Sequence, residues 1–292
     1  MTVDRLINVL VTTTLIEMMF TIGLSVTVKD LIAIAGDWRV TLRGLVGNYV
    51  CVPAITVILL IAFDARPMIA AGFVILAACP GAPYGPPLTG LGKGDVSLAV
   101  GLMIILAGSS AIVTPILLHF MLPFVCASES LSIQATKIVV TLLITQLLPL
   151  SAGIAVRQWT SSIANRLHAP ANLISKLLNV LTVALIVVTQ FHLFSDIRLK
   201  AFVGMLALLI ASWVAGWLLG GPGMAKRKAM MLTTSLRNIG VGLVIATGAF
   251  PATPAVTVAL VYGLFGVVGS LLLAFMWARF WSANNAGEGQ TE

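Results

Sequence analysis

Arg237 is the most unusual residue of this sequence, because its guanidinium lies within an apolar stretch that runs from Ala229 to Phe250. In the segment TSLRNIGVGL (234–243), Asn238 follows the arginine directly and two glycines lie close behind. A charged side chain at the centre of a bilayer costs at least about 2.5–3.5 kcal/mol on insertion scales, so it normally faces a cavity, a partner or a substrate. Arg237 and Asn238 are therefore candidate site residues.

A second segment, ILAACPGAPYGPPLTGLGKGD (75–95), contains four prolines and five glycines, too many for one unbroken helix. We predict that this helix opens between Gly81 and Pro87. Irregular backbone at membrane depth occurs only where protein or a water-filled cavity supplies hydrogen-bond partners, so the break indicates a binding site. A proline kink in a structural helix is the alternative. The candidate site residues of this segment are Tyr84, Gly85, Pro86 and Thr89.

The composition is that of a membrane protein, because 59% of the 292 residues are hydrophobic and 9% are charged, against about 25% charged residues in a soluble domain. The net charge of +7 is spread over short loops, which argues against a nucleic-acid partner. The chain lacks an HExxH motif, paired carboxylates and a Ser/His/Asp set. We therefore predict that it is not an enzyme and holds neither a metal nor a cofactor.

Apolar stretches long enough to cross a hydrocarbon core of about 30 Å follow one another along the whole chain. We predict an all-α polytopic membrane protein with about nine transmembrane helices and no separate soluble domain. The predicted spans are residues 5–27, 39–63, 68–91, 97–124, 131–156, 171–195, 199–220, 227–250 and 254–280.

The loops on the two sides of these spans differ in positive charge. One set of loops holds eleven of the 17 basic residues, namely Lys29, Arg39, Arg43, Lys93, Arg157, Arg166, Lys176, Lys226, Arg227, Lys228 and Arg279. The other set holds five, namely Arg5, Arg66, Lys137, Arg198 and Lys200. Cytoplasmic loops carry the excess of Lys and Arg, so we predict an outside N-terminus and a cytoplasmic C-terminus in the cell membrane.

The two interrupted segments lie in the third and the eighth predicted spans. An odd offset between them means that they run in opposite directions through the bilayer, as in transporters built from inverted repeats. Paired interruptions in corresponding positions of two repeats indicate the substrate site of such a transporter. We therefore predict that both breaks contribute to one site.

Four segments also carry a family resemblance: MMFTIGLSVTVKDL (18–31), GNYVCVP (47–53), AACPGAPYGPPLTGLGKGDVSLAVGL (77–102) and IVTPIL (112–117). Together they resemble the bile acid:sodium symporter family, whose pattern is a MFGMGL-like span, QFxxMP, CPGGxxSNxxTxxAxGDxALS and a downstream TP. The resemblance extends over most of the chain in order and is strongest in residues 18–117. It implies a ten-span fold, or its nine-span version, with a panel domain and a core domain in which two broken helices cross.

By this resemblance, residues 1–292 form a single transmembrane transporter domain. The core would comprise approximately residues 39–124 and 199–280, and the panel approximately residues 5–27 and 131–195. The resemblance implies alternating access, in which movement of the panel against the core exposes the site to each side in turn.

The sequence departs from the family pattern at positions that the resemblance assigns to sodium. Gly85 and Pro86 stand at the Ser-Asn pair of the family. Ala99 and Met103 stand where the next span has further hydroxyl ligands. These replacements remove ligand oxygens, which hard cations need in number.

The second crossing helix departs as well. The family has a Glu and, four residues later, a Gln-Asn pair, and the aligned residues here are Thr233, Arg237 and Asn238. Asn48 stands at the Gln of QFxxMP, whereas Thr89 keeps the family threonine. With the carboxylate gone and a guanidinium introduced, we predict that two intact sodium sites are absent.

Three roles for Arg237 remain open. In the first role, its fixed charge fills the former sodium position and holds the crossing helices together. In the second, Arg237 binds an anionic substrate directly. In the third, it forms a structural ion pair with Glu17. Glu17 itself has two interpretations, as a proton carrier that couples transport to protons or as a panel residue that pairs with Arg237 in one state only.

The sequence therefore predicts a secondary transporter that moves a small or amphipathic organic anion without sodium. The alternatives are an uncoupled facilitator or channel, and a proton-coupled carrier of a small carboxylate. The candidate substrate-binding residues are Arg237, Asn238, Tyr84, Gly85, Pro86, Thr89, Asn48 and Thr233, with Glu17 as a candidate for ion coupling or an ion pair. The predicted partners are the anion and the lipid bilayer, and the oligomeric state stays open.

Overall fold

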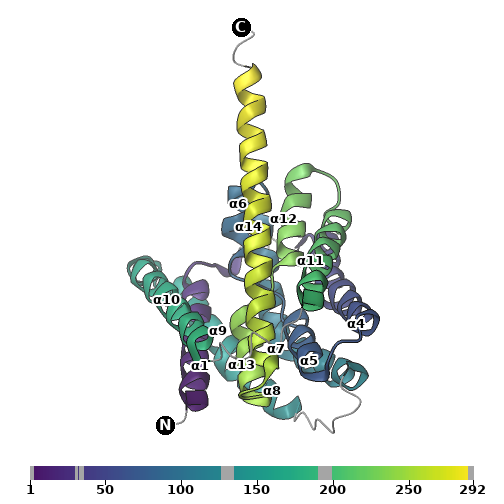
Figure 1. Cartoon of the computed structure of the whole chain (residues 1–292). Helices are drawn as coiled ribbons and strands as arrows, with labels where there is room; N and C mark the ends of the chain where they lie inside the picture. Colours follow the sequence, from purple (N-terminus) through teal and green to yellow (C-terminus); the bar gives the residue numbers. More distant parts are fainter. Residues whose placement is uncertain (1–2, 30–31, 33–35, 126–134, 190–198, 289–292) are drawn as a thin grey trace.

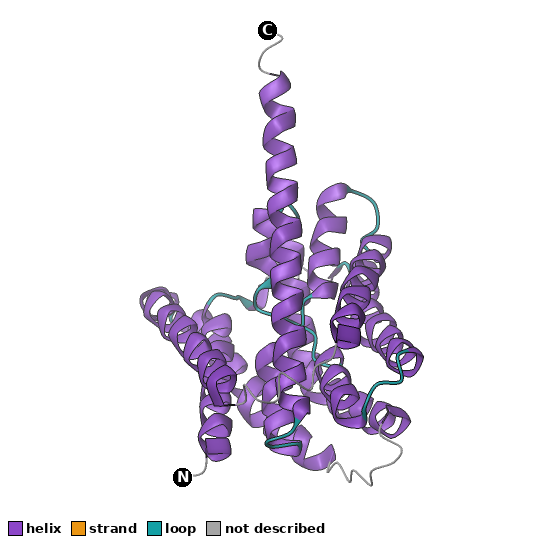
Figure 2. Ribbon diagram, viewed as in Figure 1, coloured by secondary structure: helices purple, strands orange, loops and turns teal. Residues whose placement is uncertain are grey.

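The computed structural model describes residues 3–29, 32, 36–125, 135–189 and 199–288. Within these residues every regular element is a helix and none is a strand, which confirms the predicted all-α class (Figure 2). Eight segments of the described chain are long and apolar enough to cross a membrane. The predicted third span consists instead of two short helices separated by a break, so the count of nine crossings stays a prediction.

The elements follow one another with short connections. They are α1 (Val3–Leu24), α3 (Trp38–Val46), η1 (Gly47–Cys51), α4 (Val52–Ala62), α5 (Pro67–Ala77), α6 (Gly85–Leu91), α7 (Val96–Val125), α8 (Ala135–Leu142), η2 (Leu143–Leu147), α9 (Leu148–Trp159), α10 (Ser161–Thr189), α11 (Leu199–Leu219), α12 (Met224–Ser235), α13 (Ile239–Ala249) and α14 (Pro254–Glu288). The elements η1 and η2 are π-helical turns inside longer helices. Figure 1 shows that α1 begins and α14 ends at opposite ends of the molecule, as an odd number of crossings requires.

The largest boundary error of the sequence prediction concerns α10. The predicted span starts at residue 171, whereas the helix starts at Ser161 and continues through Pro170. Lys176, which the charge count treats as a loop residue, therefore lies well inside the helix.

Helices α1, α9 and α10 pack against one another on one side of the molecule (Figure 1). The backbones of α1 and α9 touch at Gly23 and Gly153, where a Cβ on either residue would lie 2.8 Å from the Cα of the other. Such small residues allow membrane helices to approach closely. On α10, the buried hydroxyl of Thr182 lies 2.9 Å from that of Thr14 in α1. These helices correspond to the panel, a division of the chain that stays a proposal.

The other helices pack around the two interrupted spans. Helix α14 lies along α5 and α13, and α11 lies along α12. Gly72 permits the contact between α5 and α14, because a Cβ there would lie 2.6 Å from the carbonyl oxygen of Ala255. Close packing of this kind fixes the position of each half-helix in the interior.

Both spans are interrupted, over residues 78–84 between α5 and α6 and over residues 236–238 between α12 and α13. The first break lies earlier than the predicted opening between Gly81 and Pro87, because α6 already begins at Gly85 with prolines in its first turn, where a missing backbone N–H is tolerated. In the first break Gly81 has φ = +83°, which side chains rarely adopt, and a Cβ there would collide with the backbone of Ala107. In the second break the side-chain oxygen of Asn238 accepts a hydrogen bond from a backbone N–H of the first turn of α13 (3.2 Å). Asn238 is therefore the N-cap of α13.

The two breaks are in direct contact. The backbone N–H of Asn238 donates a hydrogen bond to the carbonyl oxygen of Cys79 (2.8 Å), and its side-chain Nδ2 donates to the carbonyl oxygen of Gly81 (3.4 Å). The backbone groups freed by one break are thus partly satisfied by the other, which is the condition for irregular backbone at membrane depth.

Candidate functional site

Arg237 lies in the second break and is only 2% exposed. Its Nη1 donates to the carbonyl oxygens of Ala77 (3.2 Å) and Asn48 (3.4 Å), and its Nη2 donates to the carbonyl oxygen of Thr234. Its Nε has no hydrogen-bond partner. The guanidinium is thus surrounded by backbone carbonyls from three separate segments of the chain.

Two of these carbonyls belong to the ends of half-helices. Helix α5 ends at Ala77, and α12 ends one residue after Thr234. The last carbonyls of a helix have no partner within the helix and form the negative end of its dipole. A cation is stabilised at such an end, and an arginine side chain keeps its charge throughout the physiological pH range. The contacts therefore make Arg237 a fixed cation between two helix C-termini.

An ion pair between Arg237 and Glu17 is not present in this conformation. Within the described residues, the one ion pair within 4 Å joins Lys226 to Asp37 (3.7 Å). Glu17 instead accepts a hydrogen bond at Oε1 from the hydroxyl of Thr21 (2.7 Å), and its Oε2 is buried without a partner. Pairing of Glu17 with Arg237 in another state stays a prediction.

The other predicted residues of the crossing point are buried in protein. The hydroxyl of Thr233 donates to a carbonyl of its own helix (2.8 Å), and a Cβ on Gly85 would lie 4.0 Å from this hydroxyl. Thr89 is fully buried and its Oγ1 has no partner. Asn48, in η1, donates from Nδ2 to a carbonyl one turn earlier (2.9 Å), whereas its Oδ1 has no partner. These residues, together with Arg237 and Asn238, line neither of the two cavities beside the crossing point.

The larger of these cavities has a volume of about 470 Å³ and lies between α1, α7, α10, the end of the first break and the start of α6. Of the predicted site residues, Tyr84 and Pro86 line it. Two basic side chains, Lys176 and His168, contribute to its wall, and its lining contains no Asp or Glu. The cavity therefore offers positive charge without an opposing carboxylate.

Five polar residues of α10 line this cavity and are missing from the predicted site: His168, Asn172, Ser175, Lys176 and Asn179. Their spacing places them on one face of the helix. A polar face on an otherwise apolar span indicates that the face is turned toward a cavity, so the signal is present in the segment NLISKLLN (172–179). The sequence prediction misses this polar face because its span starts at residue 171, which puts Lys176 near the cytoplasmic end of the span and not inside it.

A smaller cavity of about 170 Å³ adjoins the first, and Tyr84 and Asn179 line both. The hydroxyl of Tyr84 donates to Oδ1 of Asn179 (3.5 Å), and Nδ2 of Asn179 donates to the carbonyl oxygen of Ser175 (3.0 Å). On α1, the larger cavity is lined by residues between Met18 and Ser25, and the smaller by Val11 and Thr14. The contact between Tyr84 and Asn179 therefore lies between two cavities, one beside the C-terminal end of α1 and the other beside its middle.

Comparison with known proteins gives a consistent result. Residues 12–197 match the Sodium Bile acid symporter family. Over 278 residues the chain is 24% identical to the uncharacterized sodium-dependent transporter YocS of Bacillus subtilis (strain 168), and the match covers 92% of this chain and 83% of the relative. Over 271 residues it is 22% identical to the probable chloroplastic sodium/metabolite cotransporter BASS3 of Oryza sativa subsp. japonica, with 89% of this chain and 62% of the rice protein covered.

Proposed function

Because the chain belongs to the sodium bile acid symporter family and is a multi-pass membrane transporter, not an enzyme, we propose that it moves an organic anion by alternating access and without sodium. The observation that carries this proposal is the position of Arg237. Its guanidinium lies at the crossing of the two broken helices, among three carbonyl oxygens of the kind that would otherwise ligate a cation.

The side chains around the crossing point support independence from sodium. Gly85, Pro86, Ala99 and Met103 supply no side-chain oxygen, and the hydroxyl of Thr233 is bonded within its own helix. The guanidinium occupies the space among these carbonyl oxygens, and a sodium ion a few ångströms from it would be repelled by its fixed charge. The name of the Bacillus relative describes a sodium-dependent transporter and that of the rice relative a probable sodium/metabolite cotransporter. In our proposal this chain differs from both in that its transport is not coupled to sodium.

The larger cavity supports an anionic substrate. Its volume of about 470 Å³ lies within the usual range of small-molecule sites, about 300–1,000 Å³. Lys176 supplies the charge, Asn172 and Asn179 supply amide groups, and Met18, Val100 and Met103 supply apolar wall. We assign the anionic group of the substrate to Lys176 and not to Arg237, because Arg237 does not line this cavity.

Alternating access requires the two sides of the cavity to move against each other. In our proposal α1, α9 and α10 form the panel, and the crossing helices belong to the core. If the N-terminus lies outside, as the distribution of basic residues predicts, the C-terminal end of α1 beside the larger cavity would lie on the cytoplasmic side, and we interpret this conformation as inward-facing. Separation of Tyr84 from Asn179 would then connect this cavity with the smaller one on the outer side.

Coupling to protons is a second candidate that one observation favours. Glu17 has a buried Oε2 without a partner, and its Oε1 accepts a hydrogen bond from Thr21, which lines the larger cavity. A carboxyl group in this position can take up a proton when the cavity faces one side and release it on the other. A proton-coupled carrier would respond to a pH gradient at constant sodium, whereas an uncoupled one would not.

Cysteine accessibility tests the location of the site. In a background without the native cysteines, Tyr84→Cys and Pro87→Cys should react with a water-soluble thiol reagent, because both positions line the larger cavity. An anion that raises the apparent melting temperature of the purified protein should protect both cysteines, since such a ligand binds the folded state.

Gly85→Cys is the matched control, because Gly85 is buried between the other two positions and does not line the cavity. We expect this cysteine to react much more slowly than its neighbours. Equal reactivity at all three positions, or inert cysteines at 84 and 87, would contradict the assignment of the cavity as the substrate site.

A further inference from the structure

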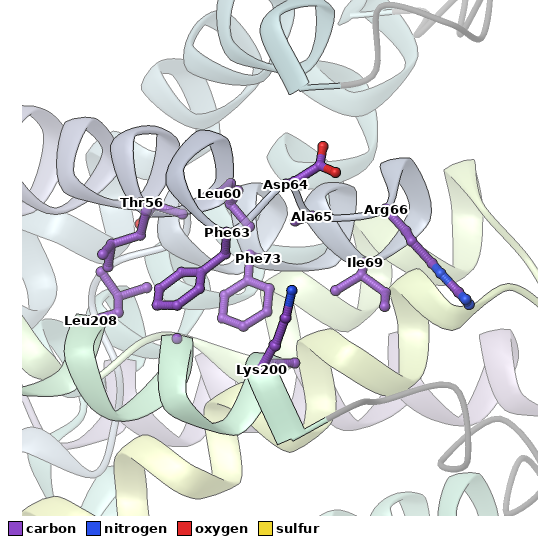
Figure 3. A pocket seen from close by; sticks show the side chains of 13 residues that line it. Thr56, Leu60, Phe63, Asp64, Ala65, Arg66, Ile69, Phe73, Lys200 and Leu208 are labelled. Carbon is purple, nitrogen blue, oxygen red and sulfur yellow. The ribbon is translucent and has the colours of Figure 1, made fainter.

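A pocket of about 260 Å³ lies between the end of α4 and the beginnings of α5 and α11 (Figure 3). It shares no lining residue with the two cavities beside the crossing point. Its floor is apolar, since Leu60, Ile69, Phe73 and Leu208 are each at most 8% exposed. The ring of Phe63 is half-buried and covers one side of the pocket.

The mouth of this pocket is positively charged. Lys200 and Arg66 are both exposed, and within the described part of the chain neither forms an ion pair within 4 Å. Figure 3 shows the side chain of Lys200 extending from α11 beside the ring of Phe73, with Ile69 between Lys200 and Arg66. The carboxylate of Asp64 points away from the phenyl rings in the same view. An anion at the mouth would therefore meet two cations before it met the carboxylate.

The mouth lies at the depth where membrane spans end. One candidate span ends at Ala62 in α4, and another begins at Leu199 in α11. Lys200 and Arg66 are thus at the level of lipid headgroups, with the apolar floor turned toward the hydrocarbon region. These loops belong to the set that holds only five basic residues, and two of those five line this pocket. The positive-inside bias does not explain such a concentration of charge on the poorer side.

We propose that this pocket binds one anionic phospholipid, with its phosphate group between Lys200 and Arg66 and an acyl chain against Phe63 and Phe73. A soluble anion would contact the two cations but would leave the apolar floor uncovered. A phospholipid contacts both, since its phosphate group meets the cations and its acyl chain packs on the floor. Gly204 lines the pocket, and a Cβ there would meet only the ring of Phe63, at 3.9 Å, so a larger side chain at this position would extend into the pocket. The pocket shares no lining residue with the cavities beside the crossing point, so a lipid bound here would not occupy the proposed substrate site.

Lipid binding to the purified full-length chain in detergent tests this proposal. We expect phosphatidylglycerol to raise the apparent melting temperature and to be retained as one molecule per chain in native mass spectrometry. Phosphatidylcholine with the same acyl chains and glycerol 3-phosphate, which lacks them, should do neither. Lys200→Gln should weaken retention of phosphatidylglycerol about fivefold, the effect of one basic residue near an anionic lipid.

Two further variants make the result specific. Gly204→Leu keeps every charge but fills the pocket, and should abolish retention. Arg166→Gln removes an exposed cation of α10 that does not line the pocket, and should leave retention unchanged. Equal retention of phosphatidylcholine, an equal effect of glycerol 3-phosphate, or undiminished retention in Gly204→Leu would each overturn the proposal.

Discussion

Arg237→Gln should reduce uptake by at least about a hundredfold at every pH tested, while the protein still inserts into the membrane. The variant leaves the carbonyl ends of α5 and α12 next to each other without a positive charge between them. A hydrogen bond to a charged group contributes about 1.5–3 kcal/mol, so the loss of two of the three bonds already corresponds to more than two powers of ten in an equilibrium constant. Uptake of a bound anion into proteoliposomes, normalised to inserted protein, measures the effect.

Arg237→Lys is the control for this experiment. It keeps the charge but loses the planar fork with which the guanidinium reaches Ala77, Asn48 and Thr234 at once, so we expect partial uptake. Full uptake by Arg237→Gln would show that the guanidinium neither replaces an ion nor supports the crossing, and would leave the pairing with Glu17 in another state as the role to test.

Lys176→Glu should raise the KM for the anion about thirtyfold, with little change in the amount of folded protein. The substitution replaces an attraction with a repulsion in a cavity whose lining contains no other acid. The lost attraction and the new repulsion each weaken the binding free energy of the anion by about 1 kcal/mol, and together they correspond to a KM about thirtyfold higher. Initial uptake rates as a function of anion concentration give the KM.

Two further substitutions on α10 separate site chemistry from general charge effects. Lys176→Arg keeps the positive charge and should have a KM close to that of the parent chain. Arg166→Glu reverses an exposed charge on the same helix outside the cavity and should also leave the KM unchanged. An unchanged KM in Lys176→Glu would exclude Lys176 as the residue that holds the anion.

The breaks could be predicted from the sequence because their causes are local. Proline lacks a backbone N–H and glycine tolerates positive φ, so the crowding of both around Gly81 predicts an open helix without knowledge of the fold. The interruption at Asn238 could be predicted in the same way, from polar and glycine residues in an apolar run. The odd offset between the two breaks then predicts their opposite directions.

The surroundings of Arg237 could not be predicted, because its carbonyl partners in Asn48 and Ala77 are far away in sequence and any residue type carries a carbonyl. The sequence therefore left three roles open, and the contacts with two helix C-termini favour the first of them. Lys176 was missed for a different reason. Its polar neighbours at helical spacing are visible in the sequence. The predicted span, however, starts ten residues after Ser161, so Lys176 is expected near the membrane surface and not well inside a helix.

The most direct test of whether the guanidinium of Arg237 takes the place of a sodium ion is a measurement of initial uptake rates in proteoliposomes. Sodium is replaced by choline or potassium at constant pH. We expect the rate of the unmodified chain to be the same in all three salts. A sodium-stimulated component should emerge only when Arg237→Gln is combined with Thr233→Glu, which restores a carboxylate next to the crossing point. Saturable stimulation of the unmodified chain by sodium, with a Hill coefficient of about two, would contradict the substitution of the ion by the arginine.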